Sequence, residues 1–150
     1  MQQAVAIPRS ALALGWLGVV PFAILAAVSV AGPPSIAAAA TAALVLYGVV
    51  ILSFMGGAQW GLALASAEDI AARARRFAIS TAPALAAFGA SFLPAPYALA
   101  GLALGFIALL AYDLAAARRG VAPGWYPALR VQLTSAVVLC LSAALVLGKS

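Results

Sequence analysis

The chain alternates long apolar runs with short polar breaks. Five apolar runs extend over residues 10–31, 36–65, 77–93, 97–117 and 128–148. A helix needs roughly 20 mostly apolar residues to cross the hydrocarbon core of a bilayer, and these runs are of that order or longer. The pattern therefore predicts an all-α membrane protein. We expect one transmembrane domain over residues 1–150, built as a bundle of five transmembrane helices.

Prolines, glycines and charges mark the breaks between the runs. Gly32-Pro33-Pro34 ends the first run, and Ser35 is a good N-cap for the second. Pro94-Ala95-Pro96 predicts a tight turn between the third and fourth runs. The polar stretches from Glu68 to Arg76 and from Arg118 to Pro127 predict loops.

The second run is too long for a simple crossing. At 1.5 Å per residue it would extend about 45 Å, against a hydrocarbon core of about 30 Å. The helix must therefore tilt, project from the membrane or bend, and Gly56-Gly57 is the natural place for a bend. Pro83 predicts a kink in the third helix.

The basic residues give the orientation. With five spans, the N-terminus and the two polar loops share one side of the membrane, and the opposite side has only Lys149. Because basic residues mark the cytoplasmic face, we expect the N-terminus inside and the C-terminus outside. The basic residues on the cytoplasmic side are Arg9, Arg73, Arg75, Arg76, Arg118, Arg119 and Arg130.

Composition supports the membrane assignment. The chain is 67% hydrophobic and 7% charged, whereas soluble domains carry roughly a quarter charged residues. Topology explains the net charge of +5, so we expect no nucleic-acid partner. The first run is too long for the apolar core of a signal peptide and lacks a basic cluster before it, which indicates a retained helix.

The chain offers little catalytic chemistry. It has no histidine, which removes the usual proton shuttle, haem ligand and most zinc or copper sites. Cys140 lies alone in the last run, and the only acidic residues are Glu68, Asp69 and Asp113. We therefore expect no enzyme activity, no metal site and no cofactor.

Distinctive polar and aromatic residues converge near the cytoplasmic face. Asp113 and Arg130 flank one short loop at similar depth, which predicts an ion pair. This pair is either a structural clamp or a polar site for an anionic headgroup or a partner's side chain. Gln59 is expected to hydrogen-bond between helices, and Trp125 and Tyr126 to anchor at the interface. The full cluster is Trp16, Gln59, Trp60, Asp113, Trp125, Tyr126 and Arg130.

Glycines predict close helix packing. Gly57 and Gly61 form one small-xxx-small pair, and Gly101 and Gly105 form another; Gly56 precedes the first pair. Gly57 and Gly61 lie on a helix face nearly opposite Gln59, since successive residues turn by about 100°. The second helix is therefore expected to be central, with one face docked closely on a neighbour.

Three segments resemble an uncharacterised membrane family, domain of unknown function 3429. They are Leu14 to Phe22, Tyr47 with Ser53 to Gly61, and Asp113 with Pro123 to Arg130. The family includes a mitochondrial inner-membrane protein of animals, so the resemblance implies an inner membrane and no established activity. The family usually carries His at the position of Gln59. A metal or proton-transfer role is therefore not carried over to Gln59 by the resemblance, whereas a hydrogen-bonding role is.

Two functions fit these features. The first is a non-catalytic accessory or assembly subunit of a larger inner-membrane complex, respiratory or photosynthetic. The alternative is a small transporter or a lipid- or quinone-binding protein, which predicts a cytoplasm-facing cavity near Gln59, Trp60, Asp113 and Arg130. The expected partners are the lipid bilayer, other membrane subunits and a bound lipid or quinone. Alanine richness and the lack of a transit peptide favour the inner membrane of a bacterium.

Overall fold

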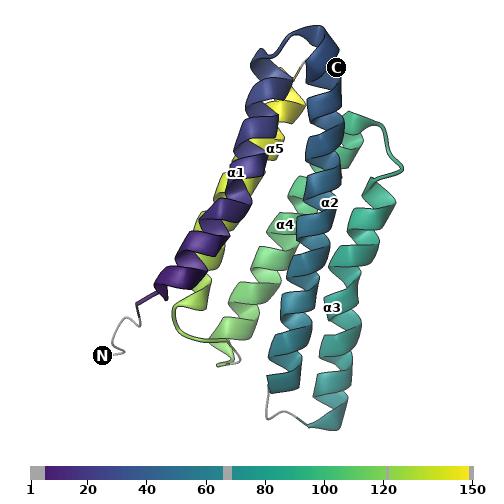
Figure 1. Ribbon diagram of the computed structural model, residues 1–150. Helices are drawn as coiled ribbons and strands as arrows, with labels where there is room; N and C mark the ends of the chain where they lie inside the picture. Colours follow the sequence, from purple (N-terminus) through teal and green to yellow (C-terminus); the bar gives the residue numbers. More distant parts are fainter. Residues whose placement is uncertain (1–5, 66–68, 121, 149–150) are drawn as a thin grey trace.

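The computed structural model describes residues 6–65, 69–120 and 122–148, which form five helices and no strand (Figure 1). The helices α1, α2, α4 and α5 are each long and apolar enough to cross a membrane. This is therefore a multi-pass membrane protein. The helices are α1 (Arg9–Ala31), α2 (Pro34–Ala65), α3 (Ile70–Ala90), α4 (Ala95–Arg118) and α5 (Tyr126–Leu147).

The third helix starts earlier than the hydrophobic pattern predicts. α3 begins at Ile70, seven residues before the expected Phe77, and ends at Ala90 rather than Leu93. The Asp69 side chain caps it by accepting a 2.7 Å hydrogen bond from the backbone N–H of Ala72. The polar stretch is therefore largely helix and not loop, because a cap and good helix formers outweigh its charge. Glu68 lies outside the described residues.

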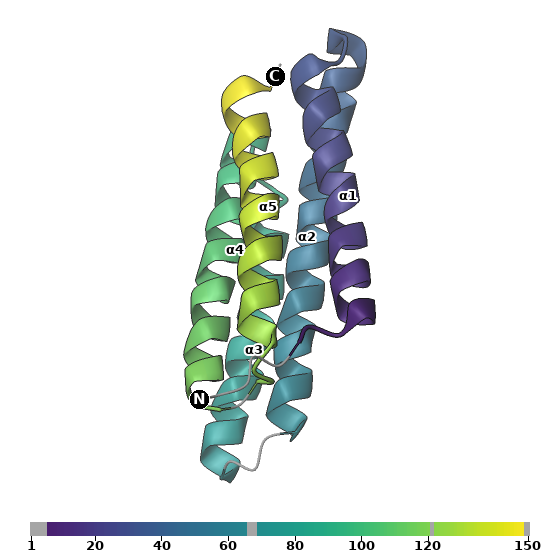
Figure 2. The same cartoon turned by 90° about the vertical axis from the view of Figure 1, so that its left-hand side faces the viewer.

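Each helix packs on its neighbours in the chain, and α5 closes the bundle by packing on α1 (Figures 1 and 2). α2 and α4 also contact each other across the middle. α2 is thus central, as the sequence predicts, since it contacts α1, α3 and α4. The start of α1, the α2–α3 connection and the α4–α5 connection share one end of the bundle, which we call the arginine end (Figure 1).

α2 is longer than the helices that it packs against. α2 continues as one helix of 32 residues through Gly56 and Gly57, and α3 likewise continues through Pro83. At the arginine end, α2 and α3 extend beyond the ends of α4 and α5 (Figures 1 and 2). Extension past the other helices is therefore one way in which this long helix is accommodated (Figure 1).

The core forms where α1, α2, α4 and α5 meet. Phe22 is completely buried and makes edge-to-face contacts with Tyr47 and Phe106, at centroid distances of 4.9 and 6.0 Å. The Tyr47 hydroxyl donates a 3.0 Å hydrogen bond to the carbonyl of Gly18, which ties α2 to α1. Other fully buried core side chains are Leu44, Leu52, Leu102 and Leu141.

Only some of the glycines expected to pack closely do so: Gly56 and Gly105 make close approaches, whereas Gly57 and Gly61 do not. A Cβ atom on Gly56 would lie 2.7 Å from the Ser80 carbonyl oxygen, and one on Gly105 would lie 2.7 Å from a Leu52 methyl. Gly101 makes only an ordinary 3.6 Å contact, measured in the same way, with Ala90. Gly57 and Gly61 are exposed, and a Cβ atom on either would have no described atom within 4 Å apart from the adjoining backbone of α2. The pair predicted to pack therefore faces outward, and its neighbour Gly56 faces α3.

Candidate functional site

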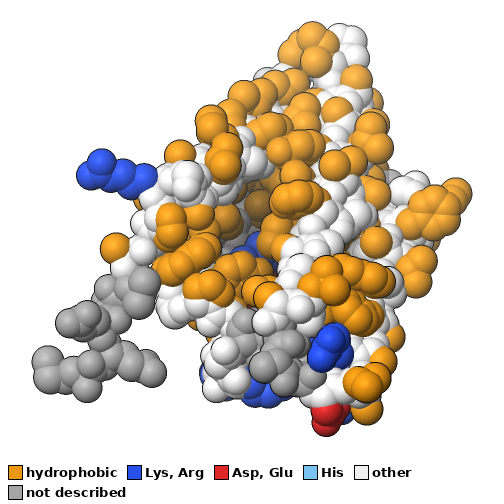
Figure 3. All heavy atoms as spheres, turned by 60° about the horizontal axis from the view of Figure 1, so that its bottom comes forward, with side chains coloured by type: hydrophobic (Ala, Val, Ile, Leu, Met, Phe, Trp, Pro, Cys, Tyr) orange, Lys and Arg blue, Asp and Glu red, His pale blue; other side chains and the backbone are white. Residues whose placement is uncertain are grey.

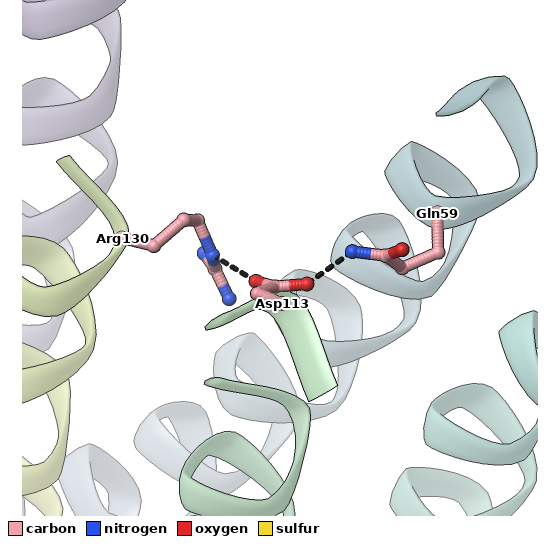
Figure 4. Close-up of polar contacts among 3 residues, drawn as sticks. All are labelled: Gln59, Asp113 and Arg130. Carbon is pink, nitrogen blue, oxygen red and sulfur yellow. Dashed lines mark hydrogen bonds and ion pairs between the residues drawn. The ribbon is translucent and has the colours of Figure 1, made fainter. Parts of the chain in front are cut away.

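Asp113 lies at the centre of a buried polar group near the arginine end. The Nε atom of Arg130 donates to one carboxylate oxygen at 2.5 Å, and the Gln59 side-chain amide donates to the other (Figure 4). Asp113 is 1% exposed and Arg130 is 4% exposed. The ion pair predicted from the sequence is therefore present. It is buried, and Gln59 extends it into a three-helix contact.

The sequence around each residue explains this meeting point. Asp113 lies near the end of α4 and Arg130 near the start of α5, so the short connection brings them to the same depth. Gln59 lies near the end of α2, which runs parallel to α4 toward the arginine end and packs on it (Figure 1). A buried charge costs several kcal/mol unless it is paired and hydrogen-bonded. Both carboxylate oxygens of Asp113 have donors here, which meets this requirement for the anion.

The hydrogen-bonding groups around Arg130 are less completely paired than those of Asp113. The Nη2 atom of Arg130 and the Thr134 hydroxyl are buried and have no hydrogen-bond partner among the described residues. The Tyr126 hydroxyl is also buried beside the Asp113 carboxylate, without a hydrogen bond of ordinary geometry among those residues. Unsatisfied buried groups of this kind are uncommon, because each costs about 1–3 kcal/mol. The Nη2 atom of Arg130 and the Thr134 hydroxyl can therefore each donate to a further acceptor.

An apolar cleft of about 120 Å³ opens beside Arg130 and Thr134, between α1, α2 and α5. Leu14 and Phe54 stand at its rim and are strongly exposed, so the cleft opens toward the lipid-facing surface. The arginine end is hollowed, with basic side-chain atoms at the floor of the hollow and apolar side chains around it (Figure 3). Arg130 and Thr134 are the polar side chains of an otherwise apolar cleft, whose other lining residues include Gly15, Gly18, Val19 and Phe22.

The remaining candidates lie apart from this group. Trp16 is 42% exposed on the outer surface of α1. Trp60 is 43% exposed and packs on the ring of Phe77 at 4.5 Å between ring centroids. Trp125 contacts the ring of Tyr126 at the start of α5. The structure therefore brings together Gln59, Asp113, Arg130 and Tyr126, and it leaves the three tryptophans outside.

Thr134 was not among the residues predicted from the sequence. It lies one turn after Arg130 on α5, and residues four apart share a helix face. Because Arg130 faces the inside of the bundle, Thr134 faces the inside as well. The available signal was that spacing, which is weak for a single threonine in an apolar helix.

The comparison with protein families covers almost all of this molecule. The profile of a family described as "Protein of unknown function (DUF3429)" matches residues 7–146, which include all seven residues of the predicted cluster. The chain belongs to the DUF3429 family. Its resemblance to that family in three motifs is thereby confirmed.

A named relative in this family is Transmembrane protein 69 of Xenopus tropicalis. It is 34% identical to this DUF3429 chain over 144 residues, which are 93% of this chain and 54% of the relative. The DUF3429 chain thus spans about half the length of this relative. No solved structure matches it.

Replacing Gln59 with Leu tests the third member of the polar group. Hydrogen bonds between membrane helices contribute about 0.6 kcal/mol on average and up to about 1.7 kcal/mol. We expect Gln59→Leu to lower the free energy of unfolding by about 1 kcal/mol, measured by SDS titration of the purified protein. Gln132→Leu is the control, because Gln132 is exposed on α5. Equal decreases in the free energy of unfolding in both variants would show that the Gln59 hydrogen bond does not stabilise the protein.

Proposed function

We propose that this protein binds a small amphiphile of the lipid or quinone class within the bilayer. The observation that carries the proposal is the apolar cleft that ends at two unpartnered buried donors, the Nη2 atom of Arg130 and the hydroxyl of Thr134. The ligand-binding alternative predicted a cytoplasm-facing cavity near Gln59, Trp60, Asp113 and Arg130. The cleft shares only Arg130 with that set and opens toward the lipid-facing surface, so it supports ligand binding at a different place. If the protein transports its ligand, the same cleft would hold it. We propose no catalytic activity for this site.

The chemistry of the cleft suits a carbonyl, carboxylate or ester oxygen on an apolar body. An oxygen acceptor near Arg130 and Thr134 would satisfy two groups that otherwise carry a desolvation cost. Because Asp113 already holds the Nε side of Arg130, the guanidinium has a fixed orientation. The apolar walls at Val19, Phe22 and Phe106 would then receive the rest of the molecule.

Filling the cleft tests this function. Gly18 lines the cleft, and a Cβ atom added to it would meet no described atom within 4 Å apart from the adjoining backbone, so Gly18→Leu places a side chain in the cleft. We expect the wild-type protein, purified in mild detergent, to retain a lipid or quinone that mass spectrometry of the organic extract identifies. Gly18→Leu is expected to reduce its recovery at least fivefold.

The control for this experiment is Gly89→Leu, which adds the same side chain at an exposed position with equally open space outside the cleft. Thr134→Val should also reduce recovery while unfolding at the same or a slightly higher SDS concentration, because it removes an unsatisfied hydroxyl. A protein that retains nothing above detergent blanks, or retains the same molecule in Gly18→Leu, contradicts the proposal.

The setting proposed for this function is the inner membrane of a bacterium, with α3 as a fifth crossing. The apolar part of α3 from Phe77 onward runs beside α2, and its three arginines precede that part. The charges at the arginine end then face the cytoplasm, with the N-terminus inside. Alkaline phosphatase fused after Gly148 should be active, and after Arg9 inactive. The reverse pattern contradicts this orientation.

A second candidate function is a non-catalytic accessory or assembly subunit of a larger membrane complex, respiratory or photosynthetic. The outward-facing Gly57 and Gly61 favour it, since a small-xxx-small face lets a second helix approach closely. We expect the protein to migrate with a larger complex on a native gel. Gly61→Leu should release it, and Gly89→Leu should not. Migration alone in the wild type contradicts this function.

A further inference from the structure

A second polar feature lies on the other side of the bundle, between α3 and α4 at the arginine end. A pocket of about 380 Å³ opens there, with three arginines and no carboxylate among the described residues that line it. Its lining is Arg75, Arg76, Ile79, Tyr112 and Arg119. Arg75 and Arg119 are exposed, so their guanidinium groups can reach a ligand at the membrane surface.

An apolar groove of about 220 Å³ adjoins this pocket. The two share Ile79 and Tyr112 in their linings, and the groove continues from there toward the middle of the bundle. Most of its other lining residues are small, namely Ala82, Pro83, Ala86, Gly105 and Ala108, and the three alanines are exposed. The groove therefore faces the surrounding lipid and has room for a chain of methylenes.

Helical spacing explains why the charged and apolar parts align. On α3, Arg75, Ile79 and Ala86 are separated by four and seven residues, which places them along one face. On α4, Tyr112 and Ala108 are four residues apart and share one face; Arg119 is the C-cap residue, seven residues after Tyr112, and lies at the end of that face. The two faces oppose each other, so one stripe runs from guanidinium groups at the membrane surface to small apolar side chains at depth.

We propose that this stripe is a binding site for an anionic phospholipid. The phosphate binds at Arg75 and Arg119, and one acyl chain lies in the groove along Ala82 and Ala108. Net negative charge is preferred because the lining is cationic and contains no described carboxylate that could hold a choline group. This site is distinct from the Arg130 cleft, since the two linings have no residue in common, although Gln59 of the buried polar group also lines the groove.

Native mass spectrometry tests the site. The purified protein, stripped of endogenous lipid in detergent, is titrated with phosphatidylglycerol and, separately, with phosphatidylcholine. We expect phosphatidylglycerol to bind at least tenfold more tightly. The double variant Arg75→Gln/Arg119→Gln should lose roughly 10- to 30-fold of that affinity, because a basic residue near an anionic surface contributes about fivefold. Equal affinity for the two lipids overturns the proposal.

The matched control is Arg9→Gln/Arg118→Gln, which removes the same charge from exposed arginines of the same end that line neither pocket. It should bind phosphatidylglycerol as the wild type does. An equal loss in this control would show a general charge effect and overturn the specific site.

Ala82→Phe separates a lipid from a free phosphate ion, because it fills the groove and leaves the arginines in place. We expect it to weaken phosphatidylglycerol binding about tenfold, while millimolar inorganic phosphate competes poorly with the lipid. If Ala82→Phe has no effect and inorganic phosphate displaces the lipid, the site is an anion site without an acyl groove, and the lipid assignment is wrong.

Discussion

Asp113→Ala is expected to lower the free energy of unfolding by about 3–5 kcal/mol, the range measured when one partner of a buried ion pair is removed. The variant leaves the Arg130 guanidinium inside the bundle without its carboxylate and also leaves the Gln59 amide without its acceptor. SDS titration in mixed micelles measures the loss, and a lower level of protein in membranes should accompany it.

A double-mutant cycle isolates the ion pair. Arg130→Ala alone should also destabilise strongly, while Asp113→Ala/Arg130→Ala should lose much less than the sum of the two single variants. Asp69→Ala is the control for removing a carboxylate, and the loss of this N-cap on α3 should cost about 1 kcal/mol. Additive single effects, or single variants as stable as the wild type, would show that the pair does not stabilise the fold.

The ion pair could be predicted because depth in a membrane is readable from sequence. Asp113 and Arg130 stand at the ends of adjacent apolar runs, and an unpaired charge at that depth is costly. Gln59 was a candidate for the same reason, although the sequence did not identify Asp113 as its acceptor. That choice depends on which face of α2 turns toward α4, and this is a property of the whole bundle.

Helix faces were harder to predict because the chain is rich in alanine. When both sides of a helix carry small apolar residues, hydrophobic periodicity does not distinguish the inside from the outside. Gly56 and Gly57 are adjacent and chemically identical, yet one faces α3 and the other faces outward. The cleft beside Arg130 was equally hidden, because its shape depends on how α1 rests on α2 and α5.

The arginines of α3 show a different limit. A polar stretch between two apolar runs is usually a loop, and residues 68–76 fit that description. The structure instead continues the helix through Arg73, Arg75 and Arg76, which places Arg75 on the same helix face as Ile79 and Ala86. Arg75 and Arg76 then line the basic pocket beside α4. Because the sequence predicted a loop at these residues, it did not indicate the proposed lipid site.

Gly56→Leu is expected to destabilise the protein by about 3 kcal/mol, at the upper end of overpacking effects. The first added carbon would lie 2.7 Å from the Ser80 carbonyl oxygen and 3.4 Å from the Cβ atom of Pro83. A backbone oxygen in the middle of α3 cannot turn away as a flexible side chain can. α2 and α3 must therefore separate, and their contact is the most extensive between any two described helices.

The neighbouring Gly57→Leu is the matched control for Gly56→Leu. Its new side chain meets open space, and replacing glycine inside a helix gains about 0.8–1.0 kcal/mol of helix propensity. We expect Gly57→Leu to unfold at the same or a higher SDS concentration than the wild type, and Gly56→Leu at a much lower one. Because the two variants have identical composition, the difference measures the α2–α3 approach alone. Equal stability of the pair would mean that α2 does not present Gly56 to α3, and the rotation of α2 that brings Gln59 to Asp113 would then be wrong as well.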